Sequence, residues 1–206
     1  MQCAVSLLWL VDEFLPRHPE IESGKLKTFE VVNQIVKPEV EERKCRYVDL
    51  IDDPNGVSRG KDIWFISHTW SQTFIELVGQ IKEHFKPINQ AIWRNGEATL
   101  EWRDIYVWLD ILAINQNFSG NDLSQLHEVI KFSQQTLMVM GDGSCLSRIW
   151  CLYEAWHSGK KGKDALKLLA YGARWERLEK VFLDLDVANA KAARVEDLST
   201  ILTDQE

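Results

Sequence analysis

The stretch Asp62-Ile-Trp-Phe-Ile-Ser67 decides the fold class, together with the segment that follows it. The run is short, apolar and rich in residues that favour extended chain, so it predicts a buried strand. In residues 72–85 the apolar side chains recur at helical spacing along one face, which predicts an amphipathic helix. The chain therefore passes directly from a strand to a helix that can cover it.

The same alternation repeats downstream. The expected strands are Ile105-Tyr-Val-Trp-Leu-Asp110, Thr136-Leu-Met-Val-Met140 and Ala165-Leu-Lys-Leu-Leu-Ala170. The expected helices cover about 123–132, 146–156 and 175–185, and a polar loop covers 115–121. Strands that alternate with helices predict a parallel sheet covered on both faces. Right-handed crossovers would make it a doubly wound α/β domain.

The residues before this domain predict a helical extension. Apolar spacing predicts a helix in 5–15, ended by Pro16, and another in 28–36, ended by Lys37-Pro38. The turn cluster Asp52-Asp-Pro-Asn-Gly56 marks the main boundary. We therefore expect an N-terminal helical extension in 1–60, an α/β domain in 61–186 and a C-terminal helical segment in 187–206, with a last helix near 195–203.

Composition narrows the classes of function. Of 206 residues, 45% are hydrophobic and 27% charged, which is enough apolar content for a core and too much for intrinsic disorder. Lys and Arg total 24 against 31 Asp and Glu, which gives a net charge of −7 and a pI near 5.3. This balance argues against nucleic-acid backbones and anionic membrane surfaces as partners.

The longest uncharged apolar run, residues 3–11, is too short to cross a bilayer and lacks the basic start of a signal peptide. The cysteines, at positions 3, 45, 145 and 151, form no CxxC pair and have no clustered His partner. Neither a zinc site nor a disulfide framework is indicated. We expect a cytoplasmic protein with reduced cysteines and no metal site.

Ligands of doubly wound sheets bind outside the carboxyl ends of the strands. The segments expected there are Ser67-His-Thr-Trp70, 110–116, Gly141-Asp-Gly-Ser144 and Tyr171-Gly172. None of them contains a GxGxxG or a GxxxxGK[ST] pattern. The sequence therefore does not support an ordinary dinucleotide-binding fold or a P-loop.

The most specific feature is Leu146-Ser-Arg-Ile-Trp-Cys-Leu-Tyr-Glu-Ala155. Ser147 is a plausible N-cap, and Trp150 and Glu154 then lie on one helical face. A carboxylate beside an indole could stabilise the positive charge that develops when a glycosidic bond breaks, while the indole stacks on a flat ring. The alternative is a core Trp and a solvated Glu.

Other candidates have two interpretations each. Ser67 and His68 could be nucleophile and base, but adjacent strand residues point to opposite faces and no third group orients them. Otherwise they contact a ligand or satisfy the strand end. Asp110 could bond a ribose hydroxyl or anchor its own loop. Cys151 could pair with a His, although a free cysteine is usually a small buried residue.

These motifs resemble the TIR (Toll/interleukin-1 receptor) domains over about residues 62–185. Phe65-Ile-Ser-His68 is similar to the first TIR strand, Val107-Trp-Leu-Asp110 to a strand that ends in Asp, and Leu137-Met-Val-Met140 to an aliphatic strand. Ser147-Arg-Ile-Trp-Cys-Leu-Tyr-Glu154 reproduces the plant-type order of serine, WCL, one variable residue and Glu. The resemblance implies a flavodoxin-like, three-layer fold.

The resemblance also implies an activity. In enzymatic TIR domains this Glu is essential for cleaving the nicotinamide–ribose bond of NAD⁺, so Glu154 is the expected catalytic residue of an NAD⁺ glycohydrolase. NAD⁺ is then the substrate, and no cofactor is expected. The residues expected to bind it are Trp150, Ser67, His68, Trp70 and Asp110.

One loop departs from the TIR pattern. TIR domains carry a Gly-rich BB loop after the second strand, whereas Ile114-Asn-Gln-Asn-Phe-Ser-Gly120 is similar to the CINQ signature of fungal heterokaryon-incompatibility (HET) domains. Ser67-His-Thr-Trp70 also resembles the first HET motif. The alternative function is a non-catalytic signalling scaffold. The resemblance implies a signalling, immune or cell-death context, with self-association and other domains of a larger protein as partners.

Overall fold

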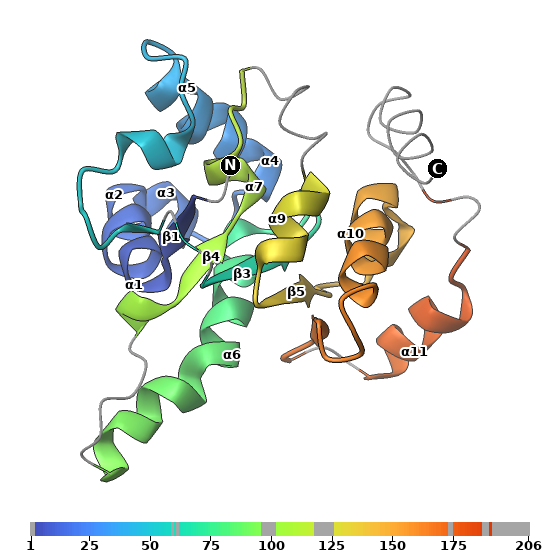
Figure 1. Ribbon diagram of the computed structural model, residues 1–206. Coiled ribbons are helices and arrows are strands. Elements are labelled where there is room, and N and C mark those ends of the chain that lie inside the picture. The colour runs from blue at the N-terminus through green and yellow to red at the C-terminus, as the bar shows by residue number, and fades with distance from the viewer. Residues whose placement is uncertain are drawn as a thin grey trace.

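The computed structural model describes residues 3–58, 60, 62–95, 102–117, 126–172, 175–186 and 190. Its centre is a mixed six-stranded sheet in the order β2-β1-β4-β3-β5-β6 (Figure 1). The strands are β1 (Ala4–Ser6), β2 (Val57–Ser58), β3 (Ile63–Ser67), β4 (Tyr106–Trp108), β5 (Gln135–Val139) and β6 (Leu166–Leu169). The predicted α/β class is therefore confirmed.

Helices connect the parallel strands, as the alternating pattern predicts. Helix α6 (Phe74–Asn95) and a short 3₁₀ helix, η4 (Trp102–Asp104), lie between β3 and β4. The helices after β4 are α7 (Asp110–Ala113), α9 (Leu126–Phe132), η5 (Ser144–Ser147), α10 (Ile149–Gly159) and α11 (Trp175–Leu183). Because the connections from β3 and from β5 leave in different directions, the β3/β5 junction is the place where such sheets open toward a ligand.

The sheet is mixed rather than wholly parallel, which corrects the sequence-based prediction. Strands β4, β3, β5 and β6 run parallel to one another. Strand β1 runs antiparallel to both of its neighbours, with Val5 opposite Val57 of β2 and Val107 of β4. The pattern missed β1 and β2 because strands of three and two residues are too short for apolar alternation to show.

The N-terminal helices also differ from the prediction at their ends. The first begins at Leu7, not at Val5, and passes through Pro16; its parts are α1 (Leu7–Trp9), η1 (Leu10–Phe14) and α2 (Leu15–Arg17). The second passes through Pro38; its parts are α4 (Thr28–Val31), η2 (Val32–Val36) and α5 (Lys37–Val40). In both, a π-helical turn precedes the proline, and such wider turns accommodate a residue without an N–H. Two short helices complete the segment, α3 (Pro19–Glu22) and the 3₁₀ helix η3 (Tyr47–Leu50).

Apolar side chains cover both faces of the sheet. Along β3, Ile63 and Phe65 face the cluster under α9 and α10, and Phe65 stacks on Trp108 with ring centroids 4.9 Å apart. Ile66 faces the opposite cluster, which contains α6 and the N-terminal helices. Figure 1 shows the blue N-terminal helices on one side of the sheet and α9 and α10 on the other. The N-terminal segment thus contributes to the main core.

The remaining expectations concern the chain ends and membranes. The predicted helix at 195–203 and residues 118–121 of the predicted polar loop lie outside the described residues. None of the described helices combines the length and the apolar character needed to cross a bilayer.

Candidate functional site

The candidate site lies where β3 and β4 end beneath helix α10. Ser67, the last residue of β3, has the same orientation as Phe65 and Ile63 because strand side chains alternate, so it faces α10. The Ser67 side chain is fully buried, and its hydroxyl oxygen has no hydrogen-bond partner. A buried polar atom without a partner is uncommon and is a candidate for contact with a ligand or water.

Glu154 reaches the same place from α10. Its Oε2 atom is inaccessible to solvent and has no hydrogen-bond partner. Burial raises the pKa of Glu154 to about 8, the neighbouring charge of Asp110 adds to the shift, and the nearby Ser67 hydroxyl opposes it. The alternative of a solvated Glu on the outer helix face does not fit this placement.

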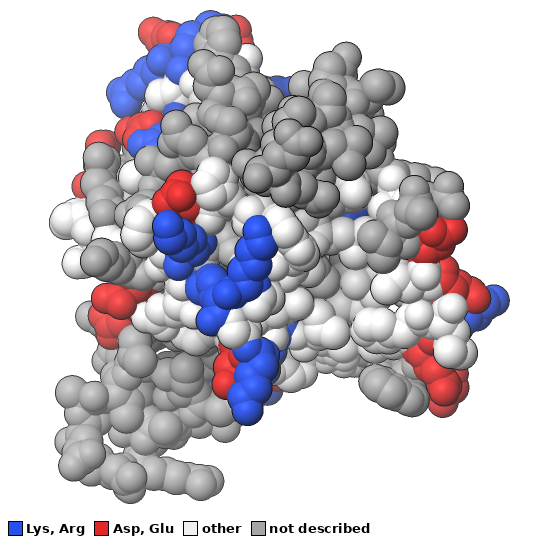
Figure 2. Space-filling model, turned by 45° about the vertical axis from the view of Figure 1, so that its right-hand side comes forward, with Lys and Arg blue, Asp and Glu red and all other residues white. Residues whose placement is uncertain are grey.

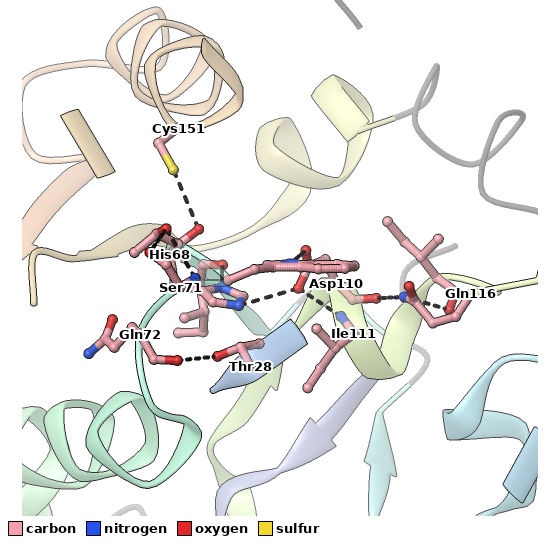
Figure 3. A network of polar contacts seen from close by, with 12 residues as sticks. Thr28, His68, Ser71, Gln72, Asp110, Ile111, Gln116 and Cys151 are labelled. Atoms are coloured by element: carbon pink, nitrogen blue, oxygen red, sulfur yellow. Dashed lines mark hydrogen bonds and ion pairs between the residues drawn. The ribbon is translucent and has the colours of Figure 1, made fainter. Parts of the chain in front are cut away.

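Asp110, the first residue of α7, follows β4 and is the centre of a polar network (Figure 3). Its Oδ1 accepts a hydrogen bond of 2.7 Å from the backbone N–H of Ile111 and lies 3.5 Å from Nε2 of His68. Its Oδ2 accepts a 2.7 Å hydrogen bond from the indole Nε1 of Trp70. Its backbone carbonyl accepts a hydrogen bond of 2.9 Å from Gln116. Asp110 therefore anchors its own loop and also fixes two side chains that follow β3.

The buried residue His68 contacts its surroundings through its ring and through its own backbone carbonyl. Its Nδ1 lies 3.4 Å from the carbonyl oxygen of Ile66, and its own carbonyl accepts a hydrogen bond of 3.4 Å from the thiol of Cys151. Figure 3 shows Cys151 reaching down from α10 to this carbonyl. Burial raises the pKa of Cys151 well above its usual value, so the group is a thiol at neutral pH. This arrangement gives no support to a Ser or Cys hydrolase, because neither nucleophile bonds to the His68 ring.

Trp150, the other residue predicted on the helix face of Glu154, lies near the start of α10. Its ring packs edge-on against Tyr153, with centroids 5.6 Å apart, at the margin of the apolar cluster under α9 and α10. Ser147 is not the N-cap, which is a wrong prediction. Arg148 occupies that position, and the Ser147 hydroxyl donates to the carbonyl of Ser144 because an extra 3₁₀ turn precedes α10.

No pattern in the sequence indicates the role of residues 26–29. The backbone N–H of Thr28 donates to the carbonyl of Gln72 at 2.9 Å, and that of Phe29 to the carbonyl of Trp70 at 3.1 Å. The N–H of Phe74 donates in turn to the carbonyl of Leu26 at 3.0 Å. The N-terminal segment thus holds the loop that carries Trp70, which only the folded chain could reveal.

A groove of about 440 Å³ opens beside this loop, at the carboxyl ends of β3, β5 and β6. It begins at Ser71 and Gln72, directly after Trp70, and extends to Gly141 and Tyr171. This is the edge at which ligands of such sheets bind. The groove therefore lies beside the loop that carries Trp70, and neither Trp70 nor Glu154 is among its lining residues.

The distribution of charge and of metal-binding side chains adds little to the description of the candidate site. Among the described residues, no group of three or more His, Cys, Asp or Glu side chains has an arrangement that could hold a metal ion. Figure 2 shows Lys and Arg side chains gathered near the centre of one face, with Asp and Glu mainly toward its margins. The acidic excess of the chain is thus unevenly distributed.

Comparison of the chain with protein-family models, with curated proteins and with solved structures finds no match. The resemblance to TIR and HET domains therefore remains a prediction from the motifs.

Proposed function

We propose that the protein is a TIR-like NAD⁺ glycohydrolase with Glu154 as its catalytic residue. The observation that carries the proposal is that two buried polar atoms without hydrogen-bond partners, Ser67 Oγ and Glu154 Oε2, lie together beneath α10 at the carboxyl end of β3, beside Asp110 and the His68 ring. Buried polar atoms without partners are uncommon and are candidates for contact with a ligand. The proposal includes the flavodoxin-like TIR type of fold and a signalling role in the cytoplasm.

The reaction breaks the bond between the nicotinamide nitrogen and the ribose. The bonding electron pair stays with the nitrogen, so neutral nicotinamide leaves and the positive charge passes to the ribose as an oxocarbenium-like cation. The Glu154 carboxylate stabilises this cation electrostatically. Water then attacks the ribose and gives ADP-ribose, and its proton is lost to Glu154 or solvent.

The raised pKa of Glu154 fits this role once the substrate is considered. With a pKa of about 8, Glu154 is largely neutral at pH 7 before substrate binds. A cationic nicotinamide ring nearby favours the ionised form and lowers the pKa, because opposite charges stabilise each other. The substrate itself therefore brings the carboxylate into its active form.

The test is nicotinamide release from NAD⁺ by the purified full chain at high concentration with a crowding agent, since the resemblance to TIR domains implies self-association. Glu154→Gln should abolish release, while Glu83→Gln, at an exposed position on α6, should retain it. Both variants should unfold cooperatively as the parent does. Release that persists in Glu154→Gln would refute the catalytic role of Glu154. A parent that releases no nicotinamide would refute the proposed enzymatic activity.

The second candidate is a signalling scaffold that acts by self-association. The observation that favours it is a run of exposed apolar side chains at the end of α11, where Phe182 is 41% and Leu183 is 80% exposed. Sedimentation of the parent and of Phe182→Glu tests it. A concentration-dependent oligomer that the substitution dissociates would support the scaffold, and an unchanged monomer in both would exclude this surface.

A further inference from the structure

We propose that Trp70 is the stacking platform for the positively charged nicotinamide ring, and that Asp110 is the positioning residue that holds it. The inference rests on the proposed function and adds to it the part of the substrate that Trp70 recognises.

Hydrogen bonds hold both the backbone and the indole ring of Trp70. Its backbone carbonyl accepts the hydrogen bond from Phe29, at 3.1 Å, and its indole Nε1 donates to Asp110 Oδ2 at 2.7 Å. Asp110 is itself fixed by the N–H of Ile111, at 2.7 Å. An aromatic side chain restrained in this way loses little conformational freedom when a ligand binds.

The ring is nevertheless available. Trp70 remains 36% exposed although its polar nitrogen is satisfied. In the described part of the chain, no aromatic ring stacks on it and no Lys or Arg lies over it, whereas Trp156 carries the ammonium of Lys160 at 3.2 Å from its centroid. The groove begins at the next residue, Ser71. An exposed, rigid indole is suited to stack on a flat ring.

The surrounding charges favour a cationic ring. The face of an indole attracts cations, and Asp110 places a carboxylate at its edge. Glu154 is close enough to Asp110 for the two charges to interact. Two further carboxylates, Glu76 and Asp142, line the groove, and its described lining contains no Lys or Arg. When the glycosidic bond breaks, the ring becomes neutral, so the platform holds the substrate more tightly than the released nicotinamide.

The first experiment measures kcat and KM for NAD⁺. Trp70→Leu should raise KM about tenfold and change kcat less than threefold, and Trp70→Phe, which keeps a ring, should recover most of the affinity. Trp156→Leu is the matched control because Trp156 is 41% exposed on the same molecule, and its KM should not change. An unchanged KM in Trp70→Leu would overturn the inference.

The second experiment measures binding without turnover, by ligand-observed NMR with N-methylnicotinamide, nicotinamide and adenosine as probes. The parent should bind cationic N-methylnicotinamide more tightly than nicotinamide, and Trp70→Leu should lose this binding. Asp110→Asn retains an acceptor for the indole but removes the charge at its edge, so it should weaken binding of N-methylnicotinamide by less than Asp110→Leu, which should lose about tenfold. Loss of adenosine binding alone in Trp70→Leu would assign the platform to a neutral purine and overturn the proposal.

The two experiments separate two kinds of failure. A parent that binds N-methylnicotinamide through Trp70 but releases no nicotinamide from NAD⁺ would refute the proposed enzymatic activity and support the stacking role of Trp70. If the parent releases nicotinamide and all Trp70 variants have the same KM as the parent, the stacking role of Trp70 is refuted and the enzymatic activity is supported.

Discussion

The hydroxyl groups of Ser158 and Thr136 lie 2.6 Å apart in a hydrogen bond that joins α10 to β5 inside the protein. Both residues are completely buried. Ser158 Oγ also lies 2.6 Å from the carbonyl oxygen of Glu154, one helical turn earlier. The pair therefore fixes α10 against the sheet at the level of the proposed catalytic residue.

Removing one hydroxyl of this pair should destabilise the protein. Ser158→Ala leaves the Thr136 hydroxyl buried without its partner, which should lower the free energy of unfolding by about 1–3 kcal/mol in urea denaturation. The double variant Ser158→Ala/Thr136→Val removes both polar groups and should recover part of the loss. Ser23→Ala, whose hydrogen bond is exposed, is the control and should change stability little. Equal losses in the single and double variants would contradict a specific pair.

Glu154→Gln should make the protein more stable at neutral and alkaline pH. The folded-state pKa of about 8 lies above the ordinary value of 4.5, so the folded protein binds a proton that the unfolded chain has released. The stability of the parent should therefore fall as pH rises from about 4.5 to 8, and Gln removes this loss. The gain should reach up to about 3 kcal/mol at pH 7 and be small at pH 4.5. Thermal unfolding of both proteins across this range measures it, and parallel curves would argue against a buried, neutral Glu154.

The rate of NAD⁺ cleavage should rise with pH. Since kcat/KM reports the groups of the free enzyme, it should increase about tenfold per pH unit below the Glu154 pKa of about 8 and level off above it. The ionised carboxylate is the form that stabilises a cation, which gives the direction of the change. Initial rates of nicotinamide release between pH 6 and 9 test this, with a control that the parent stays folded. A rate that falls over this range would exclude Glu154 as the carboxylate.

Leu10→Ala tests whether the N-terminal segment belongs to the main core. Leu10 is fully buried in the same cluster as Ile66 and Leu137 of the central strands. The substitution should lower the free energy of unfolding of the whole protein by about 2–5 kcal/mol in one transition. Leu183→Ala, at a position that is 80% exposed, should change it by less than about 0.5 kcal/mol. A separate early transition in Leu10→Ala would show that the segment unfolds by itself.

Strong periodicity made the central part of the fold predictable. Strand β3 and helix α10 follow the expected positions because each has enough residues for its apolar spacing to show. Strand β1 was not predicted because three residues are too few to show an alternating pattern. Its pairing partner, β4, also lies about a hundred residues away in the sequence. Pro16 and Pro38 were misread because the sequence does not show a π-helical turn before each of them.

The sequence predicted which residues belong to the candidate site better than it predicted the contacts between them. The strand-end rule placed Ser67 and Asp110 at one edge, and the structure finds them there. The hydrogen bond from Trp70 to Asp110 links residues forty positions apart, so spacing alone could not reveal it. Helical spacing predicted Trp150 and Glu154 on one helix face, but it could not show that the Trp150 ring packs edge-on against Tyr153.

The antiparallel insertion of β1 has a consequence for how the protein avoids aggregation. Without β1, strand β4 would end the sheet and offer its row of unpaired backbone groups to another chain. With β1 and β2 in place, the sheet ends on that side in a strand of two residues, which is too short to template a long pairing. Strands β1 and β2 therefore protect the edge of β4, the strand that Asp110 follows, from pairing with another chain.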